Sequence, residues 1–350
     1  MKNKKHIIID LILLILFIVC LILSKNYYNQ IVKENHLATI NIKSSKITNK
    51  QVNEMILKEK DSEKPYDFVA WTESENIIVN NPKLERQEEV STLEICGNSS
   101  LLVNGPILFR EDKEGCLIDE ETAYSLYGSK NVAGLSIMID NKKYIVRGIH
   151  IGEKNLVVFQ SKLTSKSLEG ENLIEDNMLD YLSVNMKNER NKYIDNFCMK
   201  YGLNQNYIDN GVYASVAYFF MMLLPFVMII YLVKEAIKVI IKNRNKLILC
   251  WLISICTILA SIILLKIFGF GFKINYDLIP NKWSDFNYWS NLFETYSEKY
   301  RYIFYMKKSC MDKNIIGKAI RCILLSIINL HIFNWIKKDI LIKSGRIVSE

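Results

Sequence analysis

Residues 116–150 read CLIDEETAYSLYGSKNVAGLSIMIDNKKYIVRGIH, and this pattern predicts a strand, a short helix and a β-hairpin. Asp119 is a suitable N-cap for a helix over 121–126, and Gly128 supplies the positive φ that commonly ends a helix. Aliphatic side chains alternate with more polar ones over 135–149, on either side of an Asp-Asn-Lys-Lys turn. The segment is polar enough to be water-soluble, although strongly apolar sequence lies beyond it in both directions.

Four apolar runs interrupt the chain of 350 residues. A helix needs roughly 20 residues to cross a hydrocarbon core of about 30 Å. We therefore expect membrane spans within 1–24 (which includes a short cytoplasmic N-terminus), 213–233, 247–268 and 315–336. The fourth run is the weakest, because Lys318 and Arg321 interrupt its first turns. The first run favours an uncleaved anchor over a signal peptide, since Ser24–Tyr28 lacks the small residues of a cleavage site.

Residues 25–212 form a polar block that is large enough for a domain of its own. Short strand patterns separated by turn signals occur over 67–71, 76–79, 90–96 and 107–110. From Ser161 onward the spacing of apolar residues is nearer to that of a helix. The predicted fold class is an α-helical membrane protein with about four transmembrane helices and an external α+β domain inserted between helices 1 and 2.

Basic residues set the expected orientation. Lysine and arginine gather in 1–5, in the loop 234–246 and in the tail 337–350. The positive-inside rule then places both termini and that loop in the cytoplasm, and it places 25–212 and the loop 269–314 outside the cell membrane. With only three spans the basic tail would lie on the outer side, which the rule disfavours.

Charge and motif content argue against several classes of protein. Much of the net charge of +8 comes from lysine and arginine at the ends of apolar runs, and no nucleic-acid-binding signature occurs, so we expect no nucleic-acid partner. The sequence contains no G-x-x-x-x-G-K-S/T phosphate loop, no G-x-S-x-G and no H-E-x-x-H. We predict no cofactor and no metal site, and we expect that the chain is not an enzyme.

Cysteine and histidine leave two chemical questions open. Cys96 and Cys116 both lie in the polar block, and a disulfide between them would require an oxidising compartment. A nucleophile made of Cys116 and His150, with Asp119 nearby, is conceivable. A histidine at a strand end and a carboxylate at a helix start are the more common structural roles.

The opening segment is similar to a pattern at the end of the external core domain in permease subunits of MacB/FtsX-like ABC transporters. The matching residues are Ala123, Leu126, Tyr127, Gly128, Asn131, Val132, Gly134, Ile137, Ile139, Tyr144, Val146 and Gly148. An anchor, a large external domain and three closely spaced helices also resemble that family, whereas the long aromatic loop before the fourth span departs from it. The resemblance implies a MacB-like external domain, and export or mechanotransmission powered by a separate ATPase subunit.

The basic segment 234–246 has two interpretations. Lys234, Lys238 and Lys242 recur every four residues and share one helical face, while aliphatic side chains share another. Such an amphipathic helix could bind lipid headgroups of the inner leaflet. The resemblance implies instead a coupling helix that contacts the ATPase. The candidate ATPase-contact residues are Lys238, Lys242, Arg244 and Lys246.

Two more features bear on mechanism. Pro225 stands in the middle of the second apolar run and is a candidate hinge. The loop 269–314 is rich in aromatic residues, and Trp283, Trp289 and Tyr305 suit an interfacial belt or packing on the external domain. A lipid, peptide or antibiotic bound between this loop and the external domain is the alternative.

The expected function is that of a permease-like subunit of an ABC transporter, which couples a separate cytoplasmic ATPase to the external domain through the first two helices. Membrane lipids and a second copy or a related permease subunit are further expected partners, although no G-x-x-x-G face marks a dimer contact. The alternative is a membrane-anchored sensor or scaffold whose external domain binds a cell-envelope partner without an ATPase.

Overall fold

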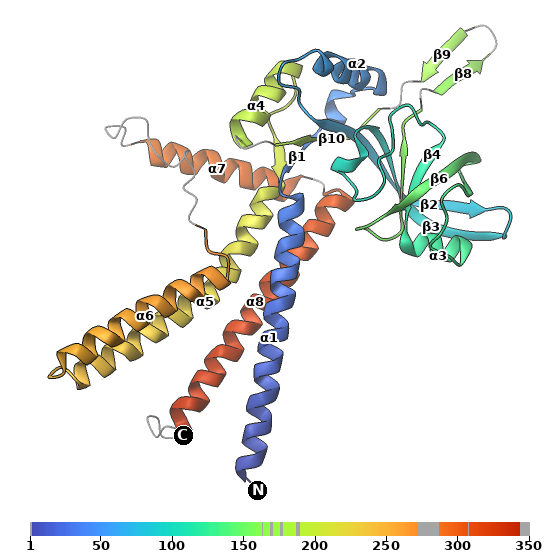
Figure 1. The fold of residues 1–350 in the computed structure, drawn as a ribbon. Coiled ribbons are helices and arrows are strands. Elements are labelled where there is room, and N and C mark those ends of the chain that lie inside the picture. Colours follow the sequence, from blue (N-terminus) through green and yellow to red (C-terminus); the bar gives the residue numbers. More distant parts are fainter. Residues whose placement is uncertain are drawn as a thin grey trace. The chain divides into compact units, whose positions relative to one another are not determined.

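The computed structural model describes residues 2–162, 164–168, 171–175, 178–186, 190–271, 287–306 and 308–343. The chain divides into two compact units, and Figure 1 labels their helices and most of their strands. The sheet unit comprises Asn35–Asn210 and Glu298–Asn314, and the helical unit comprises Met1–Glu34, Gly211–Ser297 and Ile315–Glu350.

The sheet unit contains a nine-stranded mixed sheet in the order β11-β1-β10-β2-β3-β7-β4-β6-β5. Its strands are β1 (Leu37–Asn41), β2 (Phe68–Asn81), β3 (Arg86–Gly97), β4 (Gly115–Asp119), β5 (Ser136–Ile139), β6 (Lys142–His150), β7 (Leu156–Gln160), β10 (Tyr181–Asn185) and β11 (Tyr207–Asp209). Pairs β3–β7 and β4–β6 are parallel, and the other neighbours are antiparallel. The long β2–β3 hairpin also pairs with β5 at its far end. A separate hairpin consists of β8 (Thr164–Leu168) and β9 (Glu171–Glu175).

Two hydrophobic clusters support this sheet. Its helices are α2 (Asn49–Lys60), α3 (Glu120–Tyr127) and α4 (Arg190–Tyr201). In the first cluster α2 and α4 pack against β1, β10 and the start of β2, around the fully buried Phe197. A capping box of Thr48 and Gln51 begins α2. In the second cluster α3 packs on β4, β5 and β6, with Leu126 fully buried.

The opening segment folds as its pattern predicts, into β4, α3 and the β5–β6 hairpin. The Asp119 carboxylate accepts hydrogen bonds from the amides of Glu121 and Thr122 at 2.9 and 3.2 Å, and Gly128 ends α3 with a φ of 69°. The hairpin turn has positive φ at two consecutive residues, Asp140 and Asn141, as a two-residue turn with the twist of its flanking strands requires. The helix start and the hairpin are therefore confirmed.

Other predictions for the sheet unit are confirmed only in part. Residues 107–110 form no strand, and the predicted strands 67–71 and 76–79 are parts of one strand, β2, that continues through a bulge. Among the described residues that follow Ser161, no helix occurs before α4. Instead, Tyr181–Val184 forms most of β10 and is buried at every position. Leu182 and Val184 belong to the first cluster, and Ser183 Oγ accepts a hydrogen bond from Trp71 Nε1 at 3.0 Å.

Of the helices associated with the helical unit, three are longer than their apolar runs predict, one matches its run to within a residue, and one lies in the predicted aromatic loop. They are α1 (Lys2–Glu34), α5 (Asn210–Lys242), α6 (Leu247–Ile267), α7 (Tyr288–Tyr305) and α8 (Cys310–Lys343). Among the described residues, α1, α5, α6 and α8 are long and apolar enough to cross a membrane. The segment 234–246 was predicted as a loop, but most of it is helical. Helix α5 continues to Lys242, and only a short turn separates it from α6. The second half of α7 and the first turn of α8 belong to the sheet unit.

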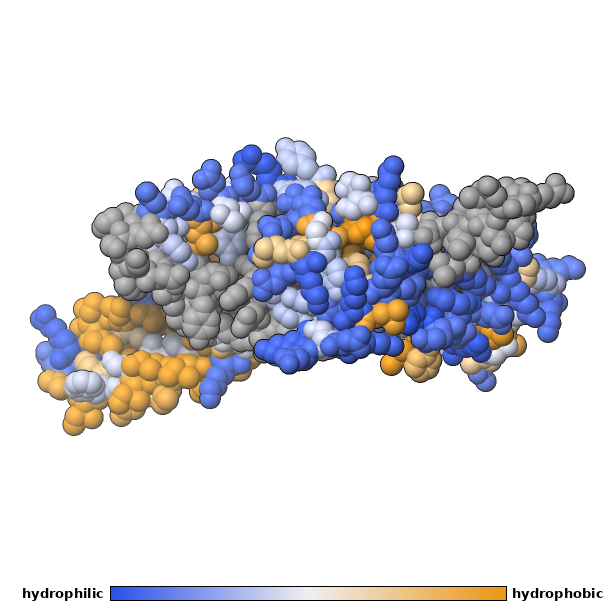
Figure 2. All heavy atoms as spheres, turned by 90° about the horizontal axis from the view of Figure 1, so that it is seen from above, coloured by the Kyte–Doolittle hydropathy of each residue, from blue (hydrophilic) through white to orange (hydrophobic). Residues whose placement is uncertain are grey.

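Hydrophobic side chains cover the outside of the α5–α6 pair. Ile248, Trp251 and Leu252 of α6 are all exposed, and Figure 2 shows orange side chains gathered over α6 and the neighbouring part of α5. An exposed apolar surface of this extent is unusual for a soluble protein. It suits contact with lipid chains.

Candidate functional site

Two helices are joined through the chain to β1 and β11, the last two strands at one edge of the sheet. Neighbouring strands β1 and β11 are antiparallel, with Ala38 at the start of β1 opposite Asp209 at the end of β11. Helix α1 ends at Glu34, three residues before β1 begins, and α5 begins at Asn210, directly after β11. Because the start of one strand faces the end of the other, α1 and α5 join the sheet at the same end of this strand pair.

A third connection lies within the sheet unit, at the first turn of α8. Its Cys310 amide donates to Glu73 Oε2 of β2 at 2.9 Å, and Lys313 Nζ lies 3.1 Å from Glu75 Oε1. Ser309 and Asp312 cap the helix through Ser309 N to Asp312 Oδ2 at 3.0 Å and Asp312 N to Ser309 Oγ at 3.2 Å. The start of α8 is thus attached to the longest strand of the sheet.

Within the helical unit, α1, α5 and α8 pack together. Ile31 of α1, Ala214 and Ala217 of α5, and Ala319 and Cys322 of α8 share one buried cluster. Small side chains allow helix backbones to approach closely in a membrane. We call this three-helix contact the seam. The sequence analysis did not identify it, although its alanines and cysteine recur three residues apart on α5 and α8.

Polar contacts extend the α1–α8 part of this seam. Ser24 Oγ lies 2.9 Å from Ser326 Oγ, and Lys318 Nζ lies 2.7 Å from Glu34 Oε1. The lysine that weakens the fourth apolar run is therefore paired with a carboxylate of α1. This pairing lowers the cost of placing its charge near the end of an apolar helix.

The four basic candidates occur together at the turn between α5 and α6. Lys238, Lys242, Arg244 and Lys246 are all exposed, and Lys238 Nζ lies 2.7 Å from Glu235 Oε1. They are not on a separate coupling helix: two of them lie in the last turns of α5 and two in the turn that follows. The hairpin thus presents a compact basic tip.

The candidate hinge Pro225 is buried inside α5, and the helix is continuous on both sides of it. Proline has no amide hydrogen, so the carbonyl of Met221 loses the helical hydrogen bond that position 225 would otherwise supply. Bending of α5 at this position remains a prediction.

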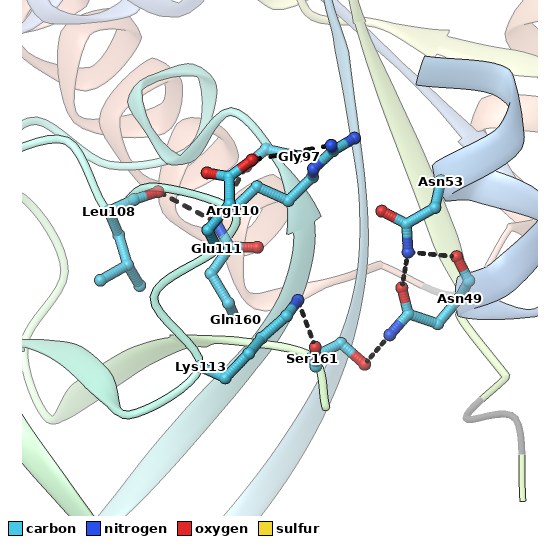
Figure 3. Close-up of polar contacts among 9 residues, drawn as sticks. All are labelled: Asn49, Asn53, Gly97, Leu108, Arg110, Glu111, Lys113, Gln160 and Ser161. Carbon is cyan, nitrogen blue, oxygen red and sulfur yellow. Dashed lines mark hydrogen bonds and ion pairs between the residues drawn. The ribbon is translucent and has the colours of Figure 1, made fainter. Parts of the chain in front are cut away.

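A polar network fixes the loop that precedes β4 (Figure 3). Gln160 Nε2 at the end of β7 donates to the carbonyls of Gly97 and Leu108, each at 3.0 Å. Lys113 Nζ donates to the carbonyl of Ser161 at 2.7 Å, and Asn49 Nδ2 of α2 donates to Ser161 Oγ at 2.8 Å. The network therefore holds the loop and α2 against the ends of β3 and β7.

This loop borders a groove of about 410 Å³ on the sheet unit. Ile107 and Phe109 lie on its rim with exposed side chains, and Tyr66 and Phe68 also line it. Arg110 Nη2 lies 3.6 Å from Glu111 Oε1, whereas its buried Nη1 has no acceptor within hydrogen-bonding distance among the described residues. An apolar rim beside a guanidinium suits an apolar segment that carries an oxygen acceptor.

Glu59 lies beside the groove and is almost fully buried. Lys200 and Tyr201 both donate to its Oε1, and the Tyr66 amide donates to its Oε2 at 3.0 Å. Burial raises the pKa of Glu59, but these three hydrogen bonds outweigh it and the pKa lies below its ordinary value. Glu59 therefore joins α2 to α4 as a carboxylate.

The structure does not assemble a Cys–His nucleophile. Cys116 is opposite Val146 in the β4–β6 pair, whereas His150 is opposite Asp119 at the far end of the same pair. Burial raises the pKa of the Cys116 thiol to about 12, so it is protonated at neutral pH. Burial also lowers the pKa of His150, whose Nε2 lies 2.9 Å from the Leu156 carbonyl.

The structure also contradicts a Cys96–Cys116 disulfide. Both thiols are free and buried. Cys96 lies on β3 and Cys116 on β4, with β7 between these strands. Two strand spacings separate the residues by about 10 Å, beyond the roughly 7 Å between Cα atoms that a disulfide can bridge. Burial raises the pKa of Cys96 to about 11.

The predicted aromatic loop contains a helix that the sequence analysis did not anticipate. Trp289 and Tyr305 lie on α7 and are exposed, whereas Trp283 lies outside the described residues. A recurrence of aromatic residues every four positions was the available signal. Among the residues that the structure describes, no group of three or more His, Cys, Asp or Glu side chains is arranged to hold a metal ion.

The chain is similar to several solved structures. No family model matches the chain, and no curated protein matches its sequence. The chain is similar to the periplasmic region of MacB from Actinobacillus actinomycetemcomitans, with 11% identity over 50% of this chain and 89% of that chain and a TM-score of 0.37. It is also similar to the extracellular domain of the noncanonic ABC-type transporter YknZ from Gram-positive bacteria, with 14% identity over 49% of this chain and 97% of that chain and a TM-score of 0.35. Neither similarity assigns this chain to a family.

Proposed function

We propose that this chain is a permease-like membrane subunit of an ABC transporter and couples a separate ATPase to an external domain. The observation that carries the proposal is the way in which the sheet and the helices are connected. Helix α1 leads into β1, the neighbouring edge strand β11 continues into α5, and the first turn of α8 is bonded to β2. A displacement of these helices would therefore be passed to the sheet at three defined points.

The basic tip of the α5–α6 hairpin is the proposed contact with the ATPase. It lies at the end of α5 opposite to the end that meets β11. A force applied at Lys238, Lys242 or Arg244 would travel along one continuous helix to the sheet. The pattern of residues over 123–148, which resembles MacB/FtsX-like permeases, supports the same assignment. In this proposal 25–212 is extracytoplasmic, and the termini and the tip are cytoplasmic.

Charge reversal of the tip tests the proposal. Lys238, Lys242 and Arg244→Glu should abolish the ATPase activity that is recovered with the affinity-purified chain in mild detergent, while membrane insertion is retained. The matched control is Lys83, Lys142 and Lys143→Glu, which changes the same number of exposed charges on the sheet unit. Equal ATPase activity in the eluates of both variants would contradict the assignment of the tip.

The groove beside Arg110 favours a second candidate function, a membrane-anchored sensor or scaffold. Exposed Ile107 and Phe109 next to a partly unsatisfied guanidinium would suit binding of a cell-envelope partner. The same purification distinguishes the two proposed functions. A sensor would be recovered without ATPase activity, and Phe109→Ser would remove its envelope partner, whereas the tip variant would not.

A further inference from the structure

Helix α7 carries an exposed stripe of aromatic side chains. Trp289, Phe293, Tyr300 and Phe304 are 50%, 77%, 43% and 85% exposed. They occupy positions i, i+4, i+11 and i+15, and because each residue of a helix advances by about 100°, all four lie within about 60° of its circumference. We call these four residues the aromatic stripe.

The other sides of α7 differ in character. Ile303 is only 8% exposed, and Leu292, which is half-buried, lies on the same side of the helix. Glu294, Glu298 and Arg301 are exposed and lie on the side away from Ile303. The aliphatic side chains therefore face protein, the charged ones face solvent, and the aromatic stripe lies between these two faces.

We propose that the aromatic stripe binds the surface of the lipid bilayer, with α7 lying in the headgroup region of the outer leaflet. Its composition supports lipid rather than a protein partner. Trp and Tyr have an apolar ring and a polar group, and they concentrate at the level of the headgroups, whereas the aliphatic residues of α7 lie on the buried side. Helices that lie in the plane of a membrane expose both a charged face and an apolar one, and on α7 the exposed apolar side chains are the aromatic stripe beside the charged face.

The connection to α8 supports the same occupant. Tyr305 ends α7, and Cys310 begins α8, a helix apolar enough to span a membrane. Five residues extend over at most about 18 Å, so the end of α7 stays close to the start of a candidate span. The inference rests on the membrane-spanning helices of the proposed function but not on an ATPase.

Brominated lipids provide the test, in the full chain reconstituted into nanodiscs of phosphatidylcholine and phosphatidylglycerol. The fluorescence of Trp289 is the difference between the unmodified chain and Trp289→Phe. We expect bromine attached near the headgroup to quench most of this signal, bromine near the ends of the acyl chains to quench less, and aqueous iodide to quench little.

Two reporter variants serve as matched controls in the Trp289→Phe background. Phe293→Trp moves the reporter one turn along the aromatic stripe and should reproduce the pattern of Trp289. Glu294→Trp places it on the charged face and should be quenched by iodide instead. Trp251 on α6, measured as the difference from Trp251→Phe, should be quenched by lipid and reports insertion.

The outcomes separate the inference from the proposed function. If Trp251 is quenched by lipid while Trp289 is quenched by iodide or by neither reagent, then water or protein covers the aromatic stripe and the inference is wrong although the membrane topology stands. If lipid quenches neither tryptophan, the spans are not inserted, and both the inference and the proposed function fall.

Discussion

Glu59 shows how a single buried charge is made stable in the sheet unit. The carboxylate is almost fully buried, and donors from α4 and from the backbone at Tyr66 surround it. Replacing the carboxylate by an amide would turn one of its two oxygens into an NH2 group, which cannot accept from Lys200 and Tyr201 or from the Tyr66 amide. A buried polar group that loses its partner costs about 1–3 kcal/mol.

We therefore expect Glu59→Gln to weaken the contact of α2 with α4 by about 1–3 kcal/mol at neutral pH. Because the pKa of Glu59 in the folded chain lies below its ordinary value, its stabilisation is complete above that value and is lost as pH falls through the folded pKa. The difference between the variant and the unmodified chain should thus shrink in acid. Hydrogen exchange of α4 amides in the detergent-solubilised chain measures it.

Glu63→Gln is the control, since Glu63 is exposed and lies four residues beyond Glu59 in the sequence. It should leave the exchange of α4 unchanged at every pH. A pH-independent difference for Glu59→Gln would show that shape, and not charge, holds the two helices together.

Residue roles that depend on neighbouring positions could be predicted from the sequence, and those that depend on distant ones could not. Asp119 and Gly128 act within a few residues of the helix that they begin and end, so their roles follow from local chemistry. Whether Cys96 can reach Cys116 depends on β7 lying between their strands. The sequence carries no direct record of that strand order.

At the scale of elements, apolar runs located the four long helices but not their ends. A membrane helix continues into water wherever caps and ion pairs stabilise it. Ser309 and Asp312 begin α8 before its apolar part, and Lys318 of that helix pairs with Glu34 at the end of α1. Strand β10 was misjudged for another reason. Leu182 and Val184 alternate with polar residues, as in a strand, but Leu179 and Leu182 are also spaced as on a helix, and so short a run fits both periods.

Helix α5 carries the next prediction. Pro225→Ala restores an amide hydrogen that can donate to the Met221 carbonyl, and a proline inside a helix costs about 3 kcal/mol relative to alanine. We expect hydrogen exchange over residues 221–229 to slow by about tenfold for each 1.4 kcal/mol of local helix stability that is gained. If α5 transmits motion by bending at this position, the variant should also lose ATP-dependent changes in the exchange of β11.

Phe226→Ala is the matched control, because Phe226 is the next residue and its side chain is exposed. It should change neither measurement. Slower local exchange with an unchanged response of β11 would assign coupling to the rigid helix and remove Pro225 from the mechanism.

At the scale of the whole molecule, the proposed function depends on which side of the membrane each unit occupies. Cys116 is unsuitable as a reporter, since it is fully buried and its thiol has a pKa of about 12. Exposed positions are better. Lys83 lies in the turn between β2 and β3, and Arg244 lies at the basic tip of the α5–α6 hairpin.

We expect a membrane-impermeant maleimide to label Lys83→Cys in intact cells and to label Arg244→Cys only after the membrane is opened. The unmodified chain gives the background, because its own cysteines include the exposed Cys256 on α6. The result matters because α5 begins directly after β11 of the sheet and ends at the basic tip. Labelling of both variants in intact cells would place the tip and the sheet unit on one side of the membrane, where no cytoplasmic ATPase could act on the tip and the coupling route along α5 would have no source of force.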